Sequence, residues 1–505
     1  MNKKLGKVLA VSMAGLSALS MVACGGGKGP GKNPVANNES TLELVVWNAG
    51  GLKEMFEQIV TAFKAKNPGV DVAMRMTTTS EVKDIHNDPN NTVDLYMSPF
   101  EAFLNYKDEL EPLNDVLEKS VDGVKVSDKV SAQAIKAMSD DNGNVYALPY
   151  YNAINGLYYN ATAFKAAGYE LPKTTDELIA LSKNIMSDEK TPFIYYADYW
   201  TYLSDVWMAQ YAGVEAYSDY WKGIYTNEDG TKEANSPKVF KENPAKRESY
   251  NVLYELLAPA KAVYRGTLSL TNTYSQTYFL QGKALMIPNG SWMENEMRNS
   301  KSDIDVGLMK TPVLSALGTK LGLGSDEELS AIVAYVDGDA TEEQAAFAAS
   351  VDASIVEAVR EARNLYFSEL SQYHSLIPAD AVAKDAAKDF LAFYYSDEAL
   401  AIMESFGSLL PATYSDGAKS KANNDSLSFF MKSCFACDAT ATYIGKALGA
   451  PLLYKNNIGK LYQYSPASEF YYVDGSATLE KYFQKENNYW DTQWNNLLKD
   501  AGLAN

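Results

Sequence analysis

Cysteine and histidine are scarce in this chain of 505 residues, which has three cysteines and two histidines. So few cysteines exclude a disulfide-rich scaffold, and so few histidines argue against a His-rich metal site. Positive charge is also in short supply, because 45 Lys and Arg stand against 64 Asp and Glu, for a formal net charge of −19. A nucleic-acid-binding protein needs a basic surface, so the composition argues against such a partner. The length is sufficient for a large core without disulfides or metals.

The first 40 residues carry targeting signals. A basic start is followed by an apolar run over 8–23, which is shorter than the ~20 residues of a membrane-spanning helix. This pattern predicts a secretory signal peptide over 1–23. Residues 21–24 (MVAC) resemble a bacterial lipobox, which implies that Cys24 becomes the lipid-modified first residue of the mature chain. Residues 24–40, rich in Gly, Pro and Asn, predict a flexible tether.

Strand and helix patterns alternate after the tether. Residues 41–47 predict a strand, an apolar face over 55–63 predicts a helix, and 70–76 and 93–97 predict two further strands. This order predicts an α/β fold with a parallel, doubly wound sheet. Ligands of such sheets bind beyond the carboxyl ends of the strands, so the strand exits are candidate ligand contacts.

Helical patterns dominate several later stretches. They cover 161–188, with breaks at Gly168 and Pro172, and most of 326–369. The stretch 195–220 is packed with aromatic residues, and the whole chain has 35 Tyr, 18 Phe and 7 Trp.

Four segments, in this order, resemble the carbohydrate-binding branch of the extracellular solute-binding lipoproteins of ABC importers, which includes maltose-binding protein. They are 143–150 (GNVYALPY) with 157–160 (LYYN), 281–292 (QGKALMIPNGSW), 305–312 (DVGLMKTP), and 386–398 (AAKDFLAFYYSDE) with 407–412 (GSLLPA). The first, third and fourth segments are similar to the places where the chain of that family crosses between lobes. No cofactor or metal is implied.

The resemblance implies a type II clamp of two α/β lobes joined by crossing strands, with the ligand in the cleft. On that basis lobe 1 would comprise 41–152 and 313–408, and lobe 2 would comprise 153–312 and 409–505. A helical insertion at about 315–370 would belong to lobe 1. The implied partners are a sugar, the permease subunits of an ABC importer and, through lipid on Cys24, the outer face of the bacterial cell membrane. A monomer is expected.

A sugar presents apolar C–H faces and a rim of hydroxyls, so its site needs flat aromatic surfaces with short polar groups. Trp292 matches the sugar-stacking tryptophan of the resembled family, and Phe470 and Tyr471 resemble its late aromatic segment. The candidate ligand-binding residues are Trp47, Asn48, Ser98, Tyr150, Tyr151, Asn152, Tyr196, Trp200, Trp292, Phe470 and Tyr471. For Ser98 the competing interpretation is a plain turn before Pro99, and for the others it is core or hinge packing.

Two other functions stay open at this point. One is a receptor of the same fold for ferric ion or another small solute, since the Tyr-Tyr pairs at 150–151, 195–196 and 471–472 could bind iron. A surface glycoside hydrolase would also be acidic and rich in aromatic residues, and would need two carboxylates. The resemblance favours a binding protein over an enzyme. The C-x-x-C spacing of Cys434 and Cys437 predicts either a local disulfide or two buried thiols.

Overall fold

The computed structural model describes most of the chain after the tether. The described residues are 39–48, 52–77, 91–99, 103–140, 142–196, 199–227, 229–241, 243–300, 302–368, 373–422, 425, 427–446, 465–471 and 478–503. The expected signal peptide, Cys24 and nearly all of the tether lie outside these residues. Within the described ranges we find no helix that combines the length and apolar character needed to span a bilayer.

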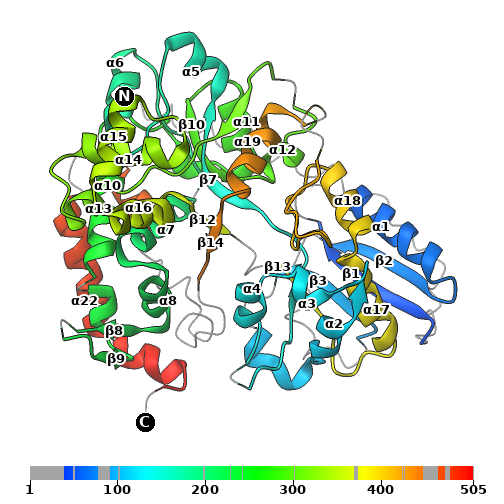
Figure 1. The fold of residues 1–505 in the computed structure, drawn as a ribbon. Helices are drawn as coiled ribbons and strands as arrows, with labels where there is room; N and C mark the ends of the chain where they lie inside the picture. Colours follow the sequence, from blue (N-terminus) through cyan, green and yellow to red (C-terminus); the bar gives the residue numbers. More distant parts are fainter. Residues whose placement is uncertain are drawn as a thin grey trace, which may run out of the picture. The chain divides into compact units, whose positions relative to one another are not determined.

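Most strands of the described residues belong to two five-stranded sheets, here called the first and second sheets (Figure 1). The first sheet has the order β2-β1-β3-β13-β6. Its strands are β1 (Thr41–Trp47), β2 (Asp71–Thr77), β3 (Leu95–Pro99), β6 (Leu148–Pro149) and β13 (Tyr373–Leu376). The parallel pairing of β1 with β2 and β3 confirms the prediction for the first three strands. However, β13 runs antiparallel to β3 and β6, so the complete sheet is mixed.

Helices cover the first sheet, and their apolar faces form its core. They are α1 (Lys53–Lys66), η2 (Phe103–Glu109), α2 (Asn114–Glu118), α3 (Val126–Lys129), α4 (Ala132–Ala137), α17 (Lys384–Tyr394) and α18 (Asp397–Ser405), with a small hairpin of β4 (Ser120–Val121) and β5 (Val124–Lys125). The predicted face of α1 is buried, and the rings of Phe56 and Tyr394 stack with centroids 5.8 Å apart. The sheet and these helices form the first lobe.

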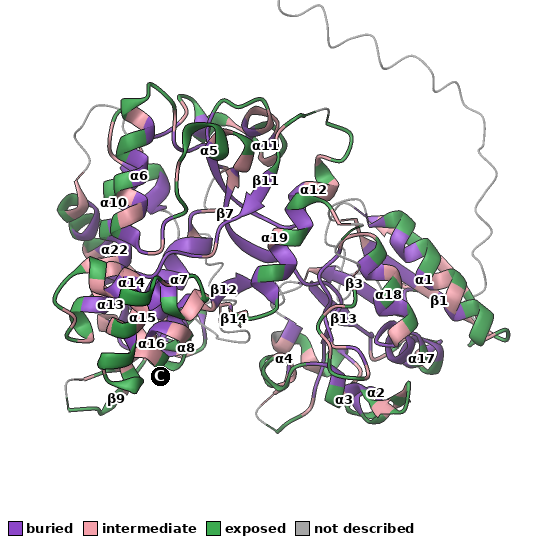
Figure 2. Cartoon of the chain, turned by 45° about the horizontal axis from the view of Figure 1, so that its top comes forward, coloured by how far each residue is buried: buried purple, intermediate pink, exposed green. Residues whose placement is uncertain are grey.

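The second sheet has the order β10-β7-β12-β14, and β11 also pairs with β7. Its strands are β7 (Ile154–Asn160), β10 (Met286–Gly290), β11 (Val306–Leu308), β12 (Leu365–Ser368) and β14 (Thr442–Ile444). β7 runs antiparallel to β10, β11 and β12. It is buried along almost its whole length, as Figure 2 shows. This central strand therefore fixes the geometry of the second lobe.

The second lobe also contains most of the helices. They are α5 (Ala161–Ala167), α6 (Thr175–Ser187), α7 (Thr201–Ala212), α8 (Val214–Lys222), α9 (Lys238–Lys241), α10 (Pro244–Leu257), η3 (Thr267–Ser269), α11 (Asn272–Leu280), α12 (Met293–Glu296), α19 (Phe429–Asp438), α21 (Pro466–Phe470) and α22 (Leu479–Asp500), with a hairpin of β8 (Ile224–Thr226) and β9 (Lys232–Ala234). The predicted break at Gly168 is confirmed, because Gly168 ends α5 with a φ of 68°.

The segment expected as an insertion of lobe 1 packs instead on the second lobe. It comprises α13 (Ser315–Lys320), α14 (Asp326–Asp337), α15 (Glu342–Ser350) and α16 (Ala353–Arg363). Thr175 Oγ1 on α6 donates to Ser315 Oγ at 3.1 Å, and Gln210 Nε2 on α7 donates to Ala362 O at 3.0 Å. The helical prediction over 326–369 holds only up to Arg363, because 365–368 form β12.

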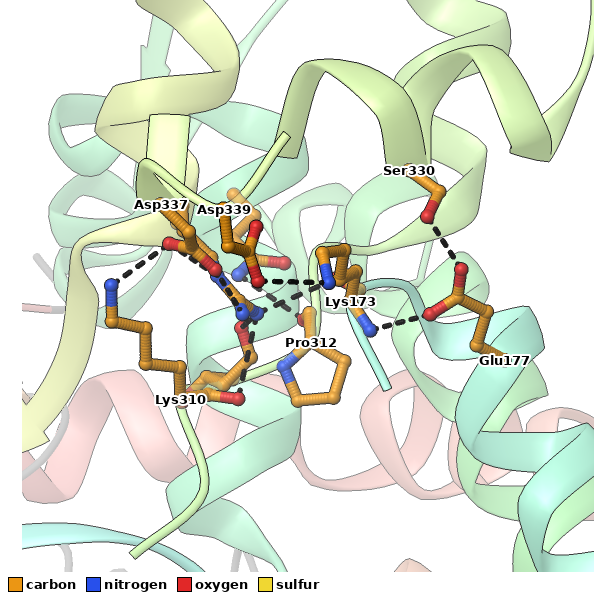
Figure 3. Close-up of polar contacts among 10 residues, drawn as sticks. Lys173, Glu177, Lys310, Pro312, Ser330, Asp337 and Asp339 are labelled. Carbon is orange, nitrogen blue, oxygen red and sulfur yellow. Dashed lines mark hydrogen bonds and ion pairs between the residues drawn. The ribbon is translucent and has the colours of Figure 1, made fainter. Parts of the chain in front are cut away.

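Charged groups that are wholly or partly buried anchor this segment (Figure 3). Asp337 on α14 pairs with Lys310 at 2.8 Å and with Arg363 at 2.7 Å. Arg363 also donates to the carbonyl oxygen of Thr311 at 2.9 Å, which ties the end of α16 to the chain that follows β11. Burial alone would raise the pKa of Asp337, but the hydrogen bonds and charges of Arg363 and Lys310 together outweigh it and lower that pKa. The pairs join residues that are about 25 and 50 positions apart, which sequence periodicity does not reveal.

The chain passes between the sheets close to the predicted first and third crossings. It leaves β6 for β7 through Tyr150–Ala153, and Leu409 forms an antiparallel bridge with Asn152. The predicted second crossing at 305–312 is wrong, because β11 pairs within the second sheet. The chain instead changes sheets between β12 and β13.

The lobe borders differ from the expected ones for this reason. Residues 313–368 lie with the second lobe, as their contacts with α6 and α7 and the pairing of β12 require. Beyond Leu409 the chain has not yet left the first lobe, because Thr413 N donates to Lys129 O at 2.9 Å and Ser415 Oγ to Asp397 at 2.6 Å. Part of the segment after 409 therefore stays with the first lobe.

Candidate functional site

One group of aromatic rings lies at the edge of the first sheet from which the chain crosses. This first aromatic cluster consists of Trp47, Tyr150, Tyr151 and Tyr373. The Tyr373 ring centroid is 5.6 Å from that of Trp47, 5.8 Å from that of Tyr150 and 5.0 Å from that of Tyr151. Trp47 ends β1 and is only partly buried, whereas Tyr150 and Tyr151 are buried. The sheet thus brings three sequence-predicted residues together around Tyr373.

Polar atoms without a hydrogen-bond partner lie at the same strand ends. They are Asn48 Oδ1, Ser98 Oγ and the Tyr150 hydroxyl. Ser98 is fully buried, and burial raises the pKa of Tyr150 well above its usual value. The main chain at Tyr150 is held in place, since the Tyr394 hydroxyl donates to its carbonyl oxygen at 2.6 Å. Buried polar groups are normally satisfied, so these three groups remain available to a polar ligand or to water.

A second group of rings lies at the corresponding edge of the second sheet. This second aromatic cluster consists of Tyr196, Tyr199, Tyr202, Trp292 and Phe367. The Trp292 ring centroid is 6.1 Å from that of Tyr199 and 6.2 Å from that of Tyr202. Tyr202 in turn is 5.4 Å from Phe367 in β12, and Tyr196 is 5.3 Å from Tyr199. Trp292 and Tyr196 are the members that the sequence predicted.

Local hydrogen bonds position Trp292 at the start of α12. Asn289 Oδ1 accepts from Gly290 N at 2.9 Å and from Gln276 Nε2 at 3.4 Å. Gln276 Nε2 also donates to Glu296 Oε2 at 2.7 Å, which links α11 to α12. Gly290 has no side chain, and a Cβ there would overlap the Trp292 ring. This glycine is therefore required for the observed position of the tryptophan.

The structure places some predicted site residues in the core of the second lobe. Trp200 is 1% exposed, and its ring lies 5.2 Å from that of Phe193. Phe470 is likewise 1% exposed and lies 5.2 Å from Tyr482 on α22. The hydroxyl of Tyr471 accepts a hydrogen bond from Gly266 N at 3.2 Å. These contacts are typical of packing residues and do not join either aromatic cluster.

Asn152 lies at the first crossing itself. Its Oδ1 accepts from Ser368 Oγ at 3.2 Å, and its main chain bridges to Leu409. Asn152 is buried, and it contacts the chain at the other two changes of sheet. Its observed partners therefore support a hinge-packing role.

The structure also describes the tyrosine and cysteine residues that the sequence suggests for other kinds of site. The Tyr195 hydroxyl donates to Ala467 O at 2.8 Å, so this tyrosine of a Tyr-Tyr pair is engaged within the core. In the part of the chain that the structure describes, no cluster of three or more His, Cys, Asp or Glu could hold a metal ion. Cys434 and Cys437 are free buried thiols on α19, and burial raises the pKa of both.

Sequence reasoning missed four members of the clusters. They are Tyr199, Tyr202, Phe367 and Tyr373. Tyr199 and Tyr202 are separated by three positions in the aromatic-rich stretch, a helical spacing that could have marked a shared face. Phe367 and Tyr373 flank the actual second crossing, which the sequence analysis placed elsewhere.

The fold and the two clusters beside the crossings are those of a two-lobed binding protein. The family model described as "Bacterial extracellular solute-binding protein" matches residues 49–401, and the chain belongs to this family. The chain is 28% identical over 187 residues to the "Multiple sugar-binding protein" of Streptococcus mutans serotype c, covering 36% of this chain and 41% of that protein.

Two further similarities extend over more of the chain. It is 27% identical over 321 residues to the "Maltooligosaccharide ABC transporter solute-binding lipoprotein" of Streptococcus pneumoniae serotype 4, covering 62% of this chain and 69% of that protein. The chain thus spans less than half of the first curated relative and about two thirds of the second. The solved structure of the solute-binding protein RafE in complex with raffinose covers 89% of this chain, with 16% identity and a TM-score of 0.56. The structural likeness establishes the type II two-lobed fold.

Proposed function

We propose that this chain is an extracytoplasmic receptor that binds a sugar or oligosaccharide and delivers it, unaltered, to the permease of an ABC importer. The observation that carries the proposal is the pair of aromatic clusters, one in each lobe, beside the places where the chain crosses. Aromatic faces match the C–H faces of sugar rings, and unpaired polar atoms match the hydroxyls. The named relatives, which bind multiple sugars and maltooligosaccharides, support the same class of ligand.

The two-lobed fold gives this binding a mechanical consequence. A ligand that contacts both clusters gains more interactions when the lobes close, so binding shifts the population toward the closed state. Each aromatic platform adds roughly 0.5–1.5 kcal/mol beyond the burial of area. Several platforms with hydroxyl hydrogen bonds are sufficient for micromolar affinity, about −8 kcal/mol. Lipid on Cys24 would keep the receptor at the membrane beside its permease.

A thermal-shift screen tests the proposal, because a ligand that binds only the folded state raises the melting temperature. The probes are maltotriose, raffinose, chitotriose and xylotriose. We expect at least one of them to shift the wild-type protein, and Trp292→Ala and Trp47→Ala to reduce that shift. Tyr274→Ala is the matched control, since this tyrosine is 58% exposed and belongs to neither cluster. Circular dichroism of each variant verifies that it is folded.

The same samples separate the proposal from its two competitors. Calorimetric heat without cleavage products in chromatography supports a receptor, whereas cleaved glycan would establish a glycoside hydrolase. A visible absorption band on addition of ferric citrate, with no response to any glycan, would establish an iron receptor. Equal glycan shifts in wild type and in both tryptophan variants would contradict the site proposed here.

A further inference from the structure

Asn155 lies at the start of β7, between two strands of the second sheet. It pairs with Gly290 of β10 on one side and with Phe367 of β12 on the other. Residues directly opposite each other in antiparallel strands project their side chains to the same face. The Asn155 amide therefore lies on the face of the sheet that carries Phe367.

Rings of the second aromatic cluster lie near this amide. A Cβ built on Gly290 would overlap the Trp292 ring and would lie 2.5 Å from Asn155 Oδ1, so the ring and the amide both approach the same glycine. The Tyr202 ring centroid is 5.4 Å from that of Phe367 and 6.2 Å from that of Trp292, so Tyr202 packs against both of these rings. The Asn155 amide thus lies beside Trp292 and on the same sheet face as Phe367, two members of the second aromatic cluster.

The amide of Asn155 has no hydrogen-bond partner, although the residue is 0% exposed. Neither Oδ1 nor Nδ2 is paired. The neighbouring asparagines are paired at least through their oxygens: Asn289 Oδ1 accepts two hydrogen bonds, although its Nδ2 has no partner, and Asn160 Oδ1 caps α5 through Ala163 N at 2.8 Å. An unpaired buried amide is destabilising, so its presence indicates a function other than stability.

We propose that Asn155 is a specificity-determining ligand residue that binds the hydroxyls of the sugar ring contacting Trp292. An amide offers one acceptor and one donor group side by side, which matches two adjacent hydroxyls of one pyranose. A sugar that lacks one of these hydroxyls leaves the amide buried and unpaired, and is rejected. This inference rests on the proposed function and adds the residue that reads the hydroxyl pattern.

The test uses the near-isosteric change Asn155→Leu, with Asn289→Leu as the matched control on the adjacent strand. If the Asn155 amide has no partner in the unliganded protein, the leucine removes a desolvation cost and raises the melting temperature by about 1–3 °C. Asn289→Leu removes an acceptor of two hydrogen bonds and lowers the melting temperature. Titration of Asn155→Leu and Asn155→Ala with maltotriose, raffinose, chitotriose and xylotriose then measures the loss of affinity, expected to be about 10- to 100-fold.

The outcomes separate this inference from the proposed function. A more stable Asn155→Leu protein with weakened glycan binding supports the role of Asn155. A lower melting temperature of Asn155→Leu, or wild-type affinity in both Asn155 variants, overturns it while leaving the receptor function intact. No response of the wild-type protein to any of the four glycans overturns both.

Discussion

The substitution Gly290→Ala is the sharpest single test of the geometry around Trp292. The alanine methyl group would overlap the Trp292 ring and lie 2.5 Å from Asn155 Oδ1, whereas ordinary contacts begin at 3.4 Å. The ring would have to move by about 1 Å, and it is held by Tyr199 and Tyr202. Since Gly290 does not have a positive φ, the alanine backbone itself is unstrained, and the steric overlap is the only destabilising contribution.

Overpacking of this kind costs about 1–3 kcal/mol. A Gly→Ala change otherwise favours folding by about 0.4–1 kcal/mol through the unfolded chain, so we expect a net loss of about 1–2 kcal/mol. Gly156→Ala, on the adjacent strand, is the matched control: its Cβ would lie 3.1 Å from the end of the flexible Leu308 side chain. We expect this control to change stability by less than about 1 kcal/mol.

Urea unfolding followed by circular dichroism measures both variants, and the thermal-shift screen measures their glycan binding. Gly290→Ala should also weaken binding, because the Trp292 ring is displaced. In the double variant Gly290→Ala/Trp292→Ala the overlap with the ring disappears, so the cost of the alanine should fall below its cost in the wild-type background. Strictly additive effects, or a Gly290→Ala protein as stable as the Gly156→Ala control, would refute this account of the site.

Three further outcomes follow from buried groups. Asp337→Asn should lower the free energy of unfolding by about 3 kcal/mol at pH 7, because it breaks the pair with Arg363. Since the pKa of Asp337 is lowered in the folded protein, this loss of stability should shrink below about pH 4. A difference in urea midpoint between variant and wild type that does not change with pH would contradict this. Burial raises the pKa of Asp205 from 3.8 to about 6. The free energy of unfolding of the wild type should therefore fall by about 3 kcal/mol, relative to that of Asp205→Asn, as the pH rises through this interval. Urea unfolding at several pH values measures this difference. In a Cys24→Ser background, Cys434 and Cys437 should react with a thiol reagent only after unfolding in guanidinium, because both thiols are buried. Labelling of the native protein would refute their burial.

Local patterns predicted much of the secondary structure, because each depends on neighbouring residues. The apolar spacing over 55–63 specified α1 and its buried face, and Gly168 specified the end of α5. The apolar periodicity of a helix does not indicate which other elements the helix packs against. The four helices of 315–363 were therefore identified as helices but assigned to the wrong lobe, since the side chains that attach them are Thr175 and Gln210 from earlier helices.

The candidate site was likewise only partly predictable from the sequence. The resemblance identified Trp292 and the residues at the first crossing, and the structure places Trp292 among the rings of the second cluster. Neither residue type nor burial separates ligand-binding aromatics from core aromatics, because Trp200, Phe470 and Tyr150 are each 1% exposed and Trp292 is 5% exposed. Trp200 and Phe470 differ in their ring contacts, which join neither cluster. Asn155 was missed because an asparagine at the start of a strand carries no periodic signal; its significance depends on neighbours from β10 and β12.

The attachment of α13–α16 has a practical use for testing the proposed closure of the two lobes. Since Thr175 on α6 and Gln210 on α7 bind this segment to the second lobe, a fluorophore on the exposed Glu343 of α15 would travel with that lobe. A second dye on the exposed Glu57 of α1 would travel with the other. Neither dye would be attached to a residue of the aromatic clusters. Energy transfer between the two dyes in single molecules would then measure how often the lobes close and how long they stay closed on a bound ligand.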